Sequence, residues 1–368
     1  MKTFMKKKYR CFLILLLTVC FLHCDKEEKV SFVNKDQRLD LQKKILLDES
    51  NEQFLGKLYG LEVDYSKNIY CLDLTSVSIA VFDSNGTRVN TIGSFGKAPG
   101  ELTNPLDFFV SDSLIAIFDA SLMRVTLFSL AGELVSYFKL DLDESYPSGA
   151  YIAITNRGTI LVSETATSAG LSRSEMYQKS WRFTEYSTDG KVLNRIGKFP
   201  ELFYEKELFN IPPASKNHFN IKSDLLFTIS TSILPTVDIY KGDSYVKSLD
   251  FSCEEFPIPG KLDNQTSMKI LNGEIERKYI GQVSYLPNSE FIVALHGIIP
   301  KGRAKGKRKY FLTALNMSGR RVLPLTDISS SLVKPVMFCT DSYDNIYYLS
   351  DDSPDNITIS KFRLVDAL

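Results

Sequence analysis

The sequence predicts an all-β protein, a six-bladed β-propeller of four-stranded antiparallel blades, whose ring is closed by an N-terminal strand that completes the last blade. Three observations predict it. Short apolar runs recur along the chain, turn residues separate them, and one order of strands and turns repeats six times. Units of this kind bury their apolar faces against their neighbours and form one domain around an axis.

The first unit, residues 61–93, shows the pattern most clearly. Residues 69–72 (Ile-Tyr-Cys-Leu) and 79–82 (Ile-Ala-Val-Phe) are typical of short buried strands. The pair Asn85-Gly86 predicts a tight hairpin turn after the third strand, because both residues accept positive φ angles. The glycine-rich residues 92–105 then carry the chain from the rim of this unit to the axis of the next.

The same order of strands returns five more times, and the last unit is one strand short. A β-compatible run at residues 39–47 precedes the first unit without a partner, and pairing it with the last unit would remove the exposed edges of an open array. Only residues 264–280 have a spacing compatible with a helix. The further units lie at residues 106–140, 150–197, 219–251, 281–325 and 336–364.

Residues 1–22 are typical of a bacterial export leader, because basic residues precede the apolar residues 11–22. A run of about 12 apolar residues is too short to span a bilayer as a helix. Cys24, followed by a charged segment, resembles the lipidated cysteine of a lipoprotein. His23 departs from the small residue expected before that cysteine, and Cys20 is the competing site. We predict a signal peptide at residues 1–23, an anchor linker at 24–38 and a propeller domain at 39–368.

The charge of the mature chain argues against nucleic-acid binding. The whole chain carries 44 basic and 44 acidic residues. Residues 1–23 hold five basic and no acidic residues, so their removal leaves 39 basic against 44 acidic residues and a net charge of −5. A nucleic-acid-binding domain is expected to carry a basic surface instead. We therefore predict no nucleic-acid partner.

The motifs of the first two units resemble a known family. The segments I-Y-C-L-D, I-A-V-F-D-S-N-G and I-G-S-F-G-K-A-P-G-E-L-T-N-P are similar to those of the NHL and TolB-like six-bladed propellers, particularly surface lipoproteins of the Bacteroidota type. The resemblance covers the chain from about residue 39 and weakens in the third to fifth units. It implies the fold and an envelope location, but fold membership does not carry function.

The long connections predict where a ligand would bind. Those of the third to fifth units, at residues 164–180, 198–218, 252–280 and 296–309, all emerge on one face of the predicted ring, whereas the turns of the opposite face are tight. Long loops on a rigid scaffold are where binding residues concentrate. We therefore predict a ligand face on the long-connection side.

Two groups of residues mark this face. The aromatic group around Pro212-Pro213 either caps the propeller core or forms a platform for a glycan or peptide. The basic group is either a solvated hairpin tip or a site for an anionic partner. The candidates are Phe203, Tyr204, Phe209 and His218 in the first group, and Lys301, Arg303, Lys305, Lys307 and Arg308 in the second.

Evidence for catalysis in the sequence is weak. Glu62, Asp107, His218 and Asn220 lie near the ends of predicted inner strands and are weak candidates for an axial divalent cation. No spacing enforces such a site, and no nucleophile or phosphate-binding motif occurs. His296 follows an apolar strand, which is more typical of a buried imidazole than of a general base.

These observations together predict a lipid-anchored binding or interaction module of the cell envelope, without a cofactor. We expect an outer-membrane lipoprotein that faces the cell surface, with a periplasm-facing body as the alternative. Its partners would be the membrane, through the N-terminal lipid, and an envelope protein or glycan. The alternative function is a lactonase-like hydrolase or lyase with one axial divalent cation.

Overall fold

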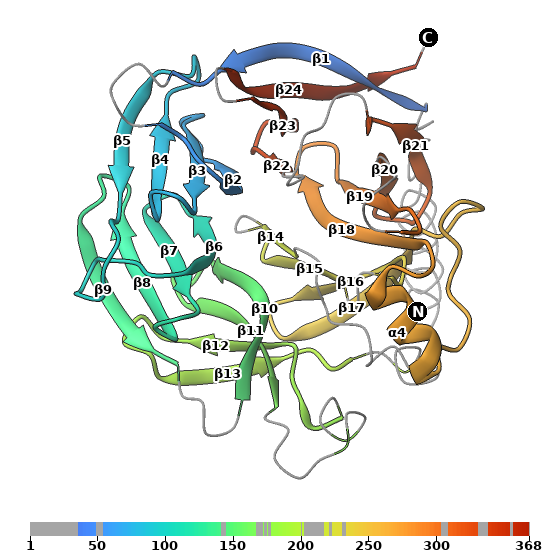
Figure 1. Ribbon diagram of the computed structural model, residues 1–368, viewed down its shortest axis with the longest axis horizontal. Helices are drawn as coiled ribbons and strands as arrows, with labels where there is room; N and C mark the ends of the chain where they lie inside the picture. Colours follow the sequence, from blue (N-terminus) through green and yellow to red (C-terminus); the bar gives the residue numbers. More distant parts are fainter. Residues whose placement is uncertain are drawn as a thin grey trace, which may run out of the picture. The chain divides into compact units, whose positions relative to one another are not determined.

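In the computed structural model of the protein, the strands form six antiparallel sheets of four strands each. The sheets follow one another around a ring (Figure 1), which confirms the predicted six-bladed propeller. The residues that the structure describes are 36–48, 54–140, 145–166, 172, 175, 178–199, 201, 217–220, 223–229, 233–302, 308–329, 338–353 and 356–367.

Each blade runs from an inner strand near the axis to an outer strand at the rim. Blades 1 to 3 consist of β2 (Leu58–Val63), β3 (Ile69–Asp73), β4 (Ser78–Phe82), β5 (Arg88–Ile92); β6 (Pro105–Val110), β7 (Leu114–Asp119), β8 (Arg124–Ser129), β9 (Leu134–Lys139); and β10 (Ser145–Ile154), β11 (Ile160–Ala166), β12 (Phe183–Tyr186), β13 (Val192–Ile196). Blades 4 to 6 consist of β14 (His218–Asn220), β15 (Leu225–Ile229), β16 (Thr236–Lys241), β17 (Ser244–Asp250); β18 (Arg277–Leu286), β19 (Phe291–Ile299), β20 (Lys309–Asn316), β21 (Arg321–Asp327); and β22 (Phe338–Thr340), β23 (Asn345–Ser353), β24 (Asn356–Asp366), β1 (Gln37–Leu46).

The N-terminal strand β1 closes the ring, as predicted. It pairs antiparallel with β24, from Gln37 opposite Asp366 to Leu46 opposite Thr358 (Figure 1). Ile45 of β1 is buried in the same apolar cluster as Leu61 of blade 1 and Leu349 of blade 6. The first blade therefore meets the last through an apolar interface, and the edge of β24 is covered.

The apolar core lies between neighbouring blades. One cluster joins Phe118 of blade 2, Phe183 of blade 3 and Leu226 of blade 4, and another joins Phe227 of blade 4 to Val283 of blade 5. The middle strands β3 and β4 are buried along their whole length, whereas outer strands such as β9 expose most of their residues. The blades thus hold one another in place, which fixes the loops at both faces.

The glycine-rich connection at residues 92–105 is the joint between blades 1 and 2. Gly93 has a φ of 78°, and a Cβ atom there would lie 2.7 Å from Leu102 Cδ1, so this position favours glycine. The buried Arg124 of β8 donates Nη1 to the carbonyl oxygen of Lys97 at 3.2 Å and Nη2 to that of Glu101. Hydrogen bonds from a neighbouring blade therefore hold the joint.

Blade 5 departs from the sequence prediction. The predicted inner strand begins at residue 281, whereas β18 begins at Arg277 and pairs that residue with Ile299. A register shift between Ile280 and Gln282 lets the pairing continue past Gly281. Residues 264–280, whose spacing is compatible with a helix, therefore form a helix only in their first half, as α4 (Asn264–Asn272).

Candidate functional site

A cavity of about 110 Å³ lies among the inner strands, and we call it the axial cavity. Its lining comes from β2, β6, β14, β18 and β22 and from the turns that follow β2, β6 and β22. Ser284 Oγ lies 3.3 Å from His218 Nδ1 and 2.7 Å from Thr340 Oγ1. These contacts connect the inner strands of the neighbouring blades 4, 5 and 6. The principal polar lining residues are Glu62, Asp64, Asp112, His218, Asn220 and Asp341.

The carboxylate of Asp64 is engaged in a turn. It accepts hydrogen bonds from the Asn68 backbone N–H and side-chain amide, both at 2.8 Å, and from the Tyr70 hydroxyl at 3.0 Å. Burial and this neighbouring carboxylate raise the pKa of Tyr70 well above its usual value. The side chain therefore stabilises the tight turn between β2 and β3.

Blade 6 repeats this arrangement with the same spacing. Asp341 accepts from the backbone N–H of Asn345 at 2.9 Å, from its side-chain amide at 2.7 Å, and from the Tyr347 hydroxyl at 2.9 Å. The pattern Asp-x-x-x-Asn-x-Tyr is visible in the sequence of both blades. Two of the acidic residues at the axial cavity thus have a structural role.

The structure brings three of the four weak metal candidates together. Glu62, His218 and Asn220 line the axial cavity. Asp107, which is buried, accepts a hydrogen bond from the Ile152 backbone N–H at 3.1 Å and so links blades 2 and 3. Within the described part of the chain, no group of three or more histidine, cysteine, aspartate or glutamate side chains is arranged to hold a metal ion.

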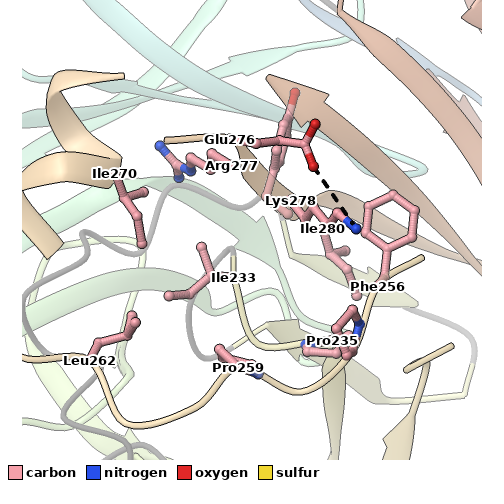
Figure 2. A pocket seen from close by; sticks show the side chains of 12 residues that line it. Ile233, Pro235, Phe256, Pro259, Leu262, Ile270, Glu276, Arg277, Lys278 and Ile280 are labelled. Carbon is pink, nitrogen blue, oxygen red and sulfur yellow. Dashed lines mark ion pairs between the residues drawn. The ribbon is translucent and has the colours of Figure 1, made fainter. Parts of the chain in front are cut away.

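A larger and more apolar pocket, of about 190 Å³, lies between blades 4 and 5 (Figure 2). Its walls come from the β15–β16 connection, the long β17–β18 connection that contains α4, and the first residues of β18. We call it the α4 pocket. Its apolar lining includes Ile233, Pro235, Phe256, Pro259, Leu262 and Ile270.

Helix α4 is fixed at both ends. Asp263 caps the N-terminus by accepting the Thr266 backbone N–H at 2.6 Å. Gly273 ends the helix with a φ of 72°, and its N–H donates to the carbonyl oxygen of Ile270 at 3.1 Å. These caps hold Ile270 against the pocket.

The β18 wall of the pocket depends on a glycine in the neighbouring strand. Tyr279 of β18 pairs with Gly297 of β19. A Cβ atom at Gly297 would lie 2.4 Å from Tyr279 Cζ. The Tyr279 ring therefore lies over Gly297, in the space that the side chain of any other residue at position 297 would occupy.

Charged side chains stand at the rim of the α4 pocket. The lining contains Arg277, Lys278 and Glu276. Figure 2 shows Glu276 directed toward Lys278, whose Nζ lies 4.0 Å from Glu276 Oε1, whereas Arg277 lies on the side of Ile270. Burial, together with the positive charge of Arg308, lowers the pKa of Arg277.

His296 lies in the middle of β19 and packs against Phe256 of the pocket wall. It is fully buried, its Nε2 lies 2.9 Å from Thr313 Oγ1, and its ring centroid lies 4.7 Å from that of Phe256. Burial, and to a lesser degree the charge of Arg321, lowers its pKa to about 3. The imidazole is therefore neutral at physiological pH and supports the Phe256 wall.

The predicted ligand-face residues fall into three groups. His218 lies at the axial cavity. Lys301 and Arg308 are described and exposed, and the Gly302 N–H donates to the carbonyl oxygen of Gly273 at 2.8 Å, which places this end of the basic segment beside the end of α4. The remaining candidates lie outside the described residues: Phe203, Tyr204, Phe209, Arg303, Lys305, Lys307 and the lipidation candidate Cys24.

Sequence reasoning missed the pocket residues themselves. Ile233, Phe256 and Ile270 lie in connections between strands, far apart in the sequence, and no short motif joins them. The length of the connection at residues 252–280 was the one available signal.

Among the described residues, no helix is both long and apolar enough to cross a membrane.

Comparison with solved structures supports the fold. A DUF4221 family member from Bacteroides vulgatus superposes with a TM-score of 0.64 at 11% identity, covering 91% of this chain and 100% of that one. A Bacteroides fragilis protein superposes with a TM-score of 0.62 at 14% identity, covering 90% of this chain and 96% of that one. A PQQ-bound aldose sugar dehydrogenase from Streptomyces coelicolor superposes with a TM-score of 0.54 at 10% identity, covering 90% of this chain and 99% of that one.

At these identities the likeness establishes the fold alone. No curated protein matches the sequence. The family model described as a six-bladed β-propeller, DUF5128, matches residues 22–230, which is more than half of the chain. The chain therefore belongs to the DUF5128 family of six-bladed β-propellers.

Proposed function

We propose that this protein is a binding module of the cell envelope that presents a ligand face built from the long connections of blades 3 to 5. The α4 pocket is the observation that carries the proposal. The long connection between blades 4 and 5 forms most of its walls, on the side where the sequence predicts the ligand face. Binding sites for small molecules are concave, mostly apolar and furnished with a few polar groups, and the α4 pocket has this composition.

Filling the pocket is expected to abolish binding of an apolar probe. Ile270 lines the pocket, whereas Met268 of the same helix does not and is 54% exposed. Ile270→Trp should weaken binding of the neutral fluorophore N-phenyl-1-naphthylamine by about tenfold or more, which corresponds to about 1.4 kcal/mol. Fluorescence titration measures the affinity.

Met268→Trp is the matched control, because it places the same side chain on the same helix outside the pocket. It should bind the probe as the wild type does. Equal affinities for wild type and Ile270→Trp, or no probe binding by the wild type, would contradict the proposal.

The second part of the proposal concerns the anchor. The leader at residues 1–23 and the charged segment after Cys24, together with the resemblance to NHL and TolB-like surface lipoproteins, support lipidation of Cys24 and an outer-membrane location facing the cell surface. In a native host, Cys24→Ala should lose labelling by a fatty-acid analogue and globomycin-sensitive processing. Cys20→Ala should keep both. If labelling persists in Cys24→Ala and disappears in Cys20→Ala, the anchor is at Cys20 instead.

A further inference from the structure

We infer that the α4 pocket binds a small organic anion, with an aromatic or short alkyl body inside the pocket and a carboxylate or sulfonate at Arg277. This inference rests on the proposed function and assigns the class of ligand to the same site. Three features of the pocket carry it: an apolar interior, the position of Arg277, and the basic segment beside α4.

The interior fits an apolar body of moderate size. Ile233, Phe256 and Leu262 are each less than 10% exposed, and they form the interior together with proline rings. An apolar cavity of about 150 Å³ is large enough to hold benzene, so the α4 pocket, at about 190 Å³, accommodates one ring or a short alkyl chain. Burial of such a body contributes about 25 cal/mol for each Å² removed from water.

Arg277 is placed to receive the charged end. Its guanidinium carbon lies 5.6 Å from the Tyr279 ring centroid, and that ring lies in turn over Gly297. This contact limits the movement of the guanidinium. A planar guanidinium pairs with a carboxylate through two parallel hydrogen bonds. A ligand with its body against Ile270 therefore has its anionic group beside Arg277 (Figure 2).

The other charges of the rim favour an anion over a cation. Lys278 and Glu276 lie within ion-pair distance and offset one another, so the lining has a net positive charge. Burial, and to a lesser degree the nearby positive charge of Arg308, lowers the pKa of Arg277. A bound anion would relieve this repulsion between two like charges.

The described basic residues at the two ends of the basic segment extend the positive field. The hydrogen bond from Gly302 to Gly273 joins this hairpin to the end of α4, and the exposed Lys301, Arg308 and Lys309 stand at its described ends. A local excess of one charge raises the concentration of oppositely charged ligands near a site. The described residues of the basic segment thus lie near the pocket, and an anionic ligand explains both features together.

Calorimetric titration with matched probes tests the inference. Octanoate and 1-octanol share an apolar chain and differ in charge, whereas acetate has the charge without the chain. Wild-type protein should bind octanoate at least tenfold more tightly than 1-octanol and should show no measurable acetate binding. Arg277→Met should bring octanoate affinity down to that of 1-octanol. Lys44→Met, which removes an exposed positive charge from β1, should behave as the wild type.

The outcomes separate the ligand class from the proposed function. If octanoate and 1-octanol bind wild type equally, the anion assignment is wrong and the apolar binding site stands. If neither probe binds, the pocket is not a binding site and both proposals are wrong. If acetate binds as tightly as octanoate, the surface recognises charge alone and the inference is overturned. The same holds if the polyanion dextran sulfate binds and octanoate does not. An unchanged preference for octanoate in Arg277→Met would also contradict it.

Discussion

Replacing Arg182 with methionine is expected to destabilise the fold by about 3–5 kcal/mol, because it breaks a buried ion pair between two blades. Arg182 precedes β12 in blade 3, and its Nη1 lies 2.8 Å from Asp238 Oδ2 in β16 of blade 4. The two side chains are 4% and 3% exposed. The substitution would leave the aspartate charge buried without this cation. Urea unfolding of the wild type and of Arg182→Met measures the difference between their free energies of unfolding.

Two further variants separate the cost of an unpaired charge from the loss of packing. The double variant Arg182→Met with Asp238→Leu should recover much of the stability, because removing both charges also removes their desolvation penalty. Lys191→Met breaks the exposed pair between Lys191 and Asp189 and should unfold as the wild type does, since exposed ion pairs contribute little. A single Arg182→Met variant as stable as the wild type would contradict this account of the interface.

Acid is expected to destabilise the protein through His296. Because the folded pKa is lowered to about 3 from about 6.5 in the unfolded chain, the proton binds the unfolded state more readily. The stability that depends on the neutral imidazole is fully present above about pH 6.5 and is lost as the pH falls toward 3. The unfolding free energy falls by about 1.4 kcal/mol for each pH unit below about 6.5, which amounts to about 2 kcal/mol at pH 5.

Comparison of variants isolates this contribution from other titrating groups. His296→Gln removes the titration, so its unfolding free energy should fall less than that of the wild type between pH 7 and pH 5. Thr313→Val removes the hydrogen-bond partner of His296 and keeps the imidazole, so it should retain the wild-type slope. Identical slopes in wild type and His296→Gln would show that this histidine does not titrate as described.

The sequence predicts the ring of blades because blade formation is local. Asn85-Gly86 and the apolar runs on either side specify a hairpin within a few residues, and the closing strand β1 follows from counting strands. The turn of Asp64, Asn68 and Tyr70 recurs at Asp341, and its spacing is visible in the sequence. These features require no knowledge of distant contacts.

The α4 pocket was beyond prediction because its residues meet only after folding. Ile233 comes from the β15–β16 connection, whereas Phe256 and Ile270 lie at separate points of the β17–β18 connection. Arg277 reaches the rim because the β18 pairing continues past Gly281. The ion pair of Arg182 and Asp238 likewise joins residues 56 positions apart. The sequence predicts that long connections gather on one face of the ring, but not which side chains converge at the pocket.

Hydrogen–deuterium exchange with and without octanoate tests the central claim most directly, because it locates binding on one face of the ring. The proposed site predicts slower exchange in α4 and at the start of β18, with the turns of residues 64–68 and 341–345 at the axial cavity unchanged. Slower exchange at those turns alone would place the ligand at the axial cavity and would contradict the account.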